Sequence, residues 1–140
     1  MKIKFILGIV CLSLATILNA QTKVPAAAES AFKQKFPSAT NVKWDKENKN
    51  EYEAAFILDG KKGSANFSST GEWLETEVGV ALTTVPAEVL AAVKNAYPAS
   101  TVKEVFSIET KAGKHYYEVE YTIGKKTNEV KVTAEGAIFK

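Results

Sequence analysis

One stretch of this chain occurs twice, and the repetition constrains the fold more than any other feature. Val24-Pro25-Ala26 begins a short amphipathic run that ends at Phe36-Pro37, and Val85-Pro86-Ala87 begins a matching run that ends at Tyr97-Pro98. The offset is the same at both ends, and prolines flank both runs, which indicates a duplicated supersecondary unit. We therefore predict two repeats, repeat one over about residues 24–80 and repeat two over about residues 85–140.

The first twenty residues have the layout of a secretory signal peptide. Two lysines form a basic start, an apolar run extends from Phe5 to Leu18, and Ala20 supplies a small residue before the expected cleavage point. An uncleaved membrane anchor is the alternative, and the short apolar run disfavours it. We expect residues 1–20 to be a signal peptide and residues 21–140 to be one periplasmic or secreted domain without a membrane span.

Composition excludes several kinds of site from this domain. The one cysteine, Cys11, lies inside the expected signal peptide, so the mature domain would have no disulfide, thiolate metal site or cysteine nucleophile. The sequence contains no arginine, and loss of the two signal lysines from 18 basic residues leaves them in balance with 16 acidic ones. A near-neutral domain without arginine lacks the usual means of gripping phosphates, so we expect no nucleic-acid partner.

Each repeat should begin with a helix that Pro25 or Pro86 introduces at its first position, where a missing amide proton costs nothing. Pro37 and Pro98 should end the helices, because the residue before a proline is pushed out of the helical region. Between them, apolar residues recur at helical spacing on the face expected to be buried. They are Ala28, Ala31, Phe32 and Phe36 in repeat one and Val89, Ala92, Val93 and Tyr97 in repeat two.

After the helices the apolar period changes to two residues, which is typical of strands. Tyr117, Val119 and Tyr121 alternate with Glu118 and Glu120, and residues 51–58 alternate in the same way. Such alternation predicts an antiparallel sheet with one covered face and one wet face. Glycine-containing turns precede further short strands, and the last strand of each repeat should cover residues 73–80 or 137–140.

One helix and about four strands, present twice, predict an α+β fold. Two tandem helix-plus-four-strand repeats would form one antiparallel sheet with both helices on one face. A single repeat would be marginally stable, whereas joining two sheets edge to edge enlarges the core and covers two strand edges. The connection over residues 80–84 is short and apolar, so we expect a single domain.

With these features the chain resembles the PepSY-like, β-lactamase-inhibitor-like family of secreted bacterial proteins. The resemblance rests on the signal peptide and on two units of helix, Phe/Tyr-Pro, a strand such as Val42-Lys43-Trp44, a Tyr-Glu strand and a glycine-containing hairpin. It implies a fold of the β-lactamase-inhibitor type, in which inhibitors grip a partner protein with the exposed sheet face and adjoining loops. It carries over no catalytic residue, and Trp44 is replaced by Val105 in repeat two.

Residues for catalysis or metal binding are only weakly indicated. His115 is the single histidine, and a lone imidazole beside Lys114 is more typical of a solvated strand end than of a metal pair or a triad. Glutamates spaced by two would share a strand face, where they could hold a divalent cation or keep a wet face soluble. These pairs are Glu51 and Glu53, Glu75 and Glu77, and Glu118 and Glu120. We expect no cofactor, no metal and no catalytic residue.

A pattern of interleaved aromatic and acidic residues is the strongest indication of function. If Thr76 and Val78 face the helices, the alternate residues of that strand should share the exposed face with those of residues 116–120. Aromatic anchors among charges suit a protein-binding surface, although Trp73 could instead pack against a loop or a helix end. The predicted partner-binding residues are Trp73, Glu75, Tyr116 and Glu118.

The sequence thus predicts a non-enzymatic protein-binding module of the periplasm or the secreted fraction, which could act as an inhibitor. Its partner would be an unidentified envelope or secreted protein. The alternative is a small-ligand or divalent-cation binding protein that uses the glutamate rows of the sheet.

Overall fold

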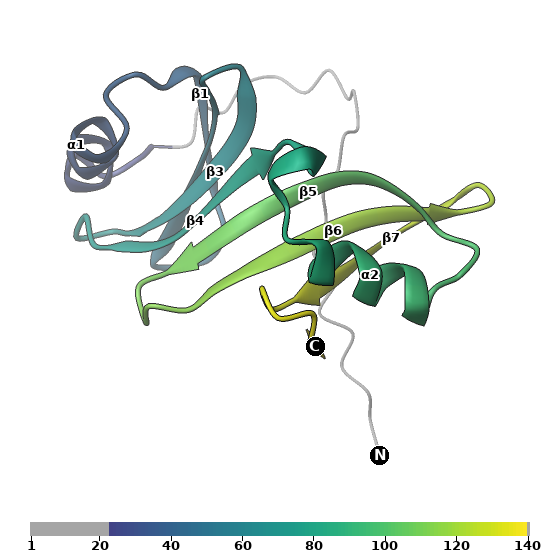
Figure 1. Ribbon diagram of the computed structural model, residues 1–140. Helices are drawn as coiled ribbons and strands as arrows, with labels where there is room; N and C mark the ends of the chain where they lie inside the picture. The colour runs from purple at the N-terminus through teal and green to yellow at the C-terminus, as the bar shows by residue number, and fades with distance from the viewer. Residues whose placement is uncertain (1–22, 140) are drawn as a thin grey trace.

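The computed structural model describes residues 23–139, so the expected signal peptide lies outside the described residues (Figure 1). Repeat one consists of α1 (Ala26–Lys35), β1 (Thr40–Lys46), β2 (Glu51–Leu58), β3 (Lys61–Ser68) and β4 (Trp73–Val80). A short 3-10 helix, η1 (Leu82–Thr84), leads into repeat two. Repeat two consists of α2 (Ala87–Ala96), β5 (Thr101–Thr110), β6 (His115–Ile123), β7 (Lys126–Val132) and β8 (Ile138–Phe139).

The strands form one eight-stranded sheet in which each strand pairs antiparallel with its neighbour in the sequence, from β1 to β8. The two repeats join where β4 pairs with β5, with Val80 opposite Val105 and Glu75 opposite Thr110. This arrangement confirms the predicted α+β fold of one helix followed by four strands, twice, in a single sheet. The joint leaves β1 and β8 as the edges of the sheet.

Prolines and aromatic residues set the limits of both helices. Pro25 and Pro86 occupy the N-cap, one residue before the first helical position that the sequence suggested, and their carbonyl oxygens accept the first backbone hydrogen bonds. Phe36 and Tyr97 are the C-caps, and each donates its amide proton to a carbonyl oxygen one turn earlier over 2.8 Å. Their non-helical backbone angles confirm that the following prolines end the helices. Neither helix of the described part has the length and apolar character needed to cross a membrane.

Each helix covers its own half of the sheet with its own core (Figure 1). In repeat one, the buried Phe32 of α1 lies at the centre of an aromatic cluster, with ring centroids 5.4 Å from Phe36, 5.5 Å from Trp44 and 5.2 Å from Phe56. In repeat two the core is mainly valine. Its buried members are Val85, Val89, Val93, Val105, Val119, Tyr121, Val130 and Val132.

The register of the sheet shows that both helices lie on the same face. Residues directly opposite one another across neighbouring strands point to the same side. One such row crosses the sheet from the core of repeat one to the core of repeat two. It contains Phe56, Gly63, Val78, Ser107, Tyr117 and Val132. The prediction of two helices on one face is therefore confirmed.

The last hairpin turn of each repeat packs against the first turn of that repeat's helix. Gly71 and Gly136 have φ angles of +86° and +85°, a region that side chains disfavour. A Cβ atom added at Gly71 would lie 2.7 Å from the carbonyl oxygen of Ala27, and one at Gly136 would lie 2.8 Å from that of Glu88. Both turns therefore need glycine, and they hold each helix over its strands.

Candidate protein-binding face

The sheet face opposite the helices, here called the open face, is covered by no helix of the described residues. Three strands from both repeats place charged side chains on its centre, because the register brings alternate residues of β4, β6 and β7 to this side. Glu75 and Glu118, both predicted as binding residues, lie on this face and are partly buried. The open face therefore combines parts of the two repeats into one surface.

Glutamates dominate the open face, and several stand directly opposite one another. Glu120 of β6 faces Glu129 of β7 on one side and Glu104 of β5 on the other. Directly opposed like charges destabilise a sheet. We call six glutamates of this face the acidic patch; they are Glu53, Glu75, Glu77, Glu118, Glu120 and Glu129, and Glu51 and Glu104 lie on the same face at its rim.

The centre of the acidic patch holds a carboxyl group whose charged form is disfavoured. The pKa of Glu77 is raised from 4.5 to about 7, mainly because burial removes water from the carboxylate. The charges of Glu118, Glu75, Glu53 and Glu129 raise the pKa of Glu77 further. Near neutral pH this carboxyl group is therefore protonated in a large fraction of molecules.

Glu53 is a second glutamate of this kind, closer to the β1 edge. Burial is again the main cause that raises its pKa to about 7, followed by a hydrogen bond with the Glu47 side chain and the negative charges of Glu47, Asp45 and Glu75. Strongly raised carboxyl pKa values of this sort gather at functional sites more often than elsewhere.

Lysine compensates part of this negative charge at one point. Lys131 of β7 lies directly opposite Glu118 of β6. Its charge lowers the pKa values of Glu75, Glu118 and Glu129, but burial outweighs it, and all three pKa values stay above their ordinary range. The acidic patch thus keeps an excess of carboxyl groups over cations.

Tyr116 lies on the open face, as predicted, but it is far less accessible than the sequence suggested. The residue is only 9% exposed, and its ring meets the Phe139 ring edge-on at 5.1 Å. Lys131 Nζ lies 5.7 Å from the ring centroid. Burial, followed by the charges of Glu75, Glu118 and Glu77, raises the pKa of Tyr116 to about 12. Tyr116 is therefore part of the floor of the acidic patch, not a protruding anchor.

The placement of Trp73 on the open face is wrong. In the pairing of β3 with β4, Asn66 is opposite Glu75 but the next residue, Phe67, is opposite Trp73. This shift in register is a β-bulge, and it puts Trp73 on the helix-bearing face together with Phe67. There the indole Nε1 donates a hydrogen bond to Thr76 Oγ1 over 2.7 Å. Lys35 Nζ lies 4.0 Å from the indole ring, and the side chain packs on the core of repeat one. This is the packing alternative that the sequence left open.

Sequence reasoning missed two other parts of the face. Ile108 of β5 lies between Glu77 and Tyr116 in the register and is 1% exposed, so it forms an apolar base under the patch. Lys131 and Glu129 extend the patch onto β7. Alternation along residues 126–132 was the available signal, because it places Val130 and Val132 inward and leaves Glu129 and Lys131 on the other side.

The remaining candidate residues form no catalytic or metal centre. His115 is exposed, and its Nε2 lies 2.8 Å from Ser107 Oγ, with no carboxylate bonded to the ring in the described part of the chain. Within residues 23–139, no group of three or more His, Cys, Asp or Glu side chains could hold a metal ion.

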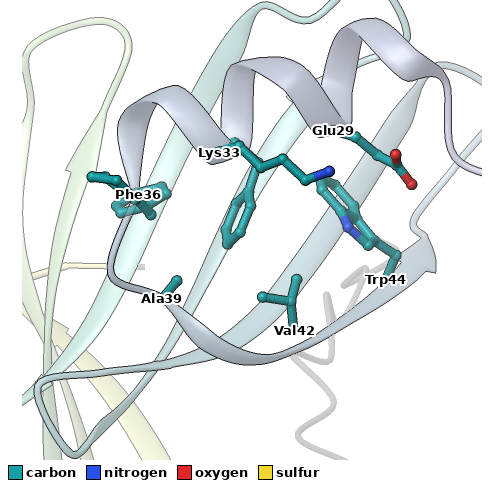
Figure 2. A pocket seen from close by; sticks show the side chains of 8 residues that line it. Glu29, Lys33, Phe36, Ala39, Val42 and Trp44 are labelled. Carbon is teal, nitrogen blue, oxygen red and sulfur yellow. The ribbon is translucent and has the colours of Figure 1, made fainter.

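Two hollows lie outside the acidic patch. One, of about 280 Å³, opens between α1 and β1 at the sheet edge, where Phe36, Val42 and Trp44 line it and Glu29 and Lys33 stand at its rim (Figure 2). The other, of about 360 Å³, lies at the junction of the repeats around η1 and the β2–β3 turn. Neither is lined by a glutamate of the acidic patch, which is a surface and not a pocket.

Comparison with known proteins places this geometry in a family. The family model described as "Putative beta-lactamase-inhibitor-like, PepSY-like" matches residues 16–57 and 50–140. No curated protein matches the chain.

Several solved structures share the fold at low sequence identity. A protein from Bacteroides eggerthii, described among "putative periplasmic proteins", has a TM-score of 0.75 at 20% identity, covering 84% of this chain and 86% of its own. A DUF2874 family protein from Bacteroides ovatus has a TM-score of 0.71 at 22% identity, covering 84% and 85%. A BLIP-like protein from Bacteroides fragilis has a TM-score of 0.65 at 24% identity, covering 81% and 82%.

The similarity to these solved structures shows the fold, whereas the match to the family model shows which family the chain belongs to. The family's description names inhibitor-like proteins and no catalytic activity. The two matched segments overlap and together extend over both repeats. The chain therefore belongs to the PepSY-like, β-lactamase-inhibitor-like family.

Proposed function

We propose that this protein is a non-enzymatic binding module of the periplasm or the secreted fraction that holds another protein on its open face. The observation that carries the proposal is the acidic patch, a broad charged surface built jointly by the two repeats. Carboxyl groups that are partly buried and mutually repelling cost folding stability, so their retention on one uncovered face is better explained by a partner than by folding.

The shape of the site supports a protein partner over a small ligand. A small molecule is normally enclosed in a cleft lined by apolar and polar groups. The acidic patch spreads over β2, β4, β6 and β7 and lines neither of the two hollows described above. The family's inhibitor-like description and the BLIP-like fold relative make inhibition the form of binding to test first once a partner is known.

Site-specific crosslinking tests the proposal, and the single cysteine of the chain makes it simple. Cys11 lies in the expected signal peptide, so a processed single-cysteine variant can carry one photo-reactive label. Labels at Ser64→Cys or Thr110→Cys, half-buried positions on the open face, should crosslink a specific protein in an envelope extract of the source organism. The matched control is Ser30→Cys, an exposed position on α1.

We expect the same crosslinked protein from both open-face labels and at least about fivefold less of it from the α1 label, because binding energy is concentrated at the contact surface. Equal yields from all three labels, or a product from the α1 label alone, would contradict the proposal. Mass spectrometry of the adduct then identifies the partner, and its activity can be assayed with and without this protein.

A further inference from the structure

The charge of the acidic patch is not balanced within the described residues. Lys62 pairs with Glu104, at the rim of the patch opposite Glu120, over 3.2 Å, and Lys111 pairs with Glu72; neither ion pair of the described residues includes one of the six patch glutamates. Among the charges that shift the pKa values of Glu53, Glu75, Glu77, Glu118 and Glu129, the only cation is Lys131. A ligand that brings positive charge to this surface would supply what the fold lacks.

A second feature, independent of the carboxyl groups, is the phenol of Tyr116. The side chain is about nine-tenths buried, its hydroxyl takes part in no side-chain hydrogen bond found among residues 23–139, and the hydroxyl oxygen is not one of the fully enclosed, unpartnered atoms of that part of the chain. Tyr116 shares the open face with Glu118, two residues along β6, and the charges of Glu75, Glu118 and Glu77 add to the burial that raises the pKa of Tyr116. The hydroxyl can therefore donate or accept a hydrogen bond with a group that a partner brings to the patch.

From these two features we infer that the protein partner presents a lysine- or arginine-bearing segment to the open face, with a cationic group seated among Glu75, Glu77 and Glu118 beside the Tyr116 hydroxyl. The inference rests on the proposed function and adds the chemistry of the partner. Charge complementarity carries it, since opposite charges across an interface steer encounter and fix register. The Tyr116 ring and Ile108 supply an apolar floor for the alkyl part of such a side chain.

Binding of a cation should also release protons. A cation favours the ionised form of nearby carboxyl groups, so glutamates that are protonated in the free protein lose their protons when the segment binds. The groups that bear on this titration lie on β1, the β1–β2 turn, β2, β4, β6 and β7, with Lys62 of β3 and Glu104 of β5 as an ion pair at the rim. They are Asp45, Glu47, Glu51, Glu53, Glu75, Glu77, Tyr116, Glu118, Glu120, Glu129 and Lys131. Affinity should therefore rise with pH across the neutral range.

Calorimetry with the peptide hexaarginine tests the inference without knowledge of the partner. We expect saturable binding that is about threefold to tenfold tighter at pH 8 than at pH 6, is weakened by salt, and releases protons, shown by heats that differ between phosphate and Tris buffers. Hexaglutamate is the matched peptide control. Heat on addition of calcium chloride would indicate an ion site and would overturn the inference.

Protein variants make the test specific for this face. The double variant Glu75→Gln/Glu118→Gln should weaken hexaarginine binding about tenfold, whereas Lys131→Gln, which removes the compensating lysine, should tighten it. The control is Glu109→Gln, an exposed glutamate on the helix-bearing face, which should leave binding unchanged. Glutamine relieves repulsion in the patch, so the double variant is expected to fold.

The outcomes separate this inference from the proposed function. If hexaarginine does not bind, or binds the double variant and the parent equally, the cationic inference is overturned. If the labels at Ser64 and Thr110 still crosslink a protein in that case, binding through the open face stands and the partner uses other chemistry. If the labels at Ser64 and Thr110 crosslink no specific protein, the proposed function is contradicted, whether or not hexaarginine binds.

Discussion

Truncation of Phe32 to alanine should lower the free energy of unfolding by about 3 to 5 kcal/mol. Phe32 is 3% exposed, and its ring lies within aromatic contact distance of Phe36, Trp44, Phe56 and Phe67. Removing it leaves a cavity that these rigid rings cannot close, because each is held by other neighbours in the same cluster. Urea denaturation followed by circular dichroism measures the change.

The repeat provides matched variants for this experiment. Val93→Ala truncates the equivalent residue of α2 and should cost about 1 to 3 kcal/mol, since a smaller side chain leaves a smaller cavity. Leu82→Ala, at a position that is 42% exposed, should change stability by less than about 0.5 kcal/mol. If both core variants unfolded at the same urea concentration as the parent protein, the assignment of the two helix cores would be wrong.

Replacement of Glu77 by glutamine should stabilise the protein at pH 8 and leave its stability almost unchanged near pH 4. The folded-state pKa of Glu77 is about 7, above its ordinary value of 4.5, so the folded protein holds a proton that the unfolded chain has lost. The stability that this proton provides is present below about pH 4.5 and is lost as the pH rises through about 7. Glutamine has a similar shape and no charge to lose.

The free energy of unfolding at pH 8 should rise by on the order of 1 to 3 kcal/mol. The upper value corresponds to nearly the whole pKa shift of Glu77, and solvent screening lowers it. Melting temperatures from pH 4 to pH 8 measure it, with Glu109→Gln on the helix-bearing face as the control. Parallel curves for the parent and Glu77→Gln would show that Glu77 is an ordinary solvated carboxylate. The melting temperature of the Glu77→Gln variant should still fall as the pH rises, though less steeply than that of the parent protein, because Glu53 remains.

The repeat made most of the fold predictable. Two proline-bounded amphipathic runs place the helices within a residue of their observed limits, and period-two alternation assigns the inward residues of β2 and β6 correctly. Duplication also predicts the single sheet. An isolated repeat would have a small core and an unpaired strand edge, and joining two repeats edge to edge enlarges the core and covers those edges. The sequence placed Pro25 and Pro86 at the first helical position, whereas both are N-caps, one residue earlier. The backbone angles of proline fit either position.

The candidate site was less predictable, for local and tertiary reasons. The β-bulge between β3 and β4 reverses the alternation at Trp73, and a bulge leaves no mark on the period of apolar residues. The burial of Tyr116 depends on Phe139 of β8, a strand of only two residues, which no pattern along β6 can reveal. Glu75 and Glu118 were placed correctly because both lie beyond the bulge in regular strands.

The functional account of the open face depends on glutamates that are held together at the centre of the sheet and repel one another. Carboxyl ¹³C NMR of the labelled protein, titrated from pH 3 to pH 9, measures this directly for each glutamate. The structure predicts midpoints near pH 7 for Glu77 and Glu53 and midpoints raised above 4.5 for Glu75, Glu118 and Glu129. Midpoints close to 4.5 for all five would show independent, solvated carboxylates and would contradict the acidic patch as a strained binding surface.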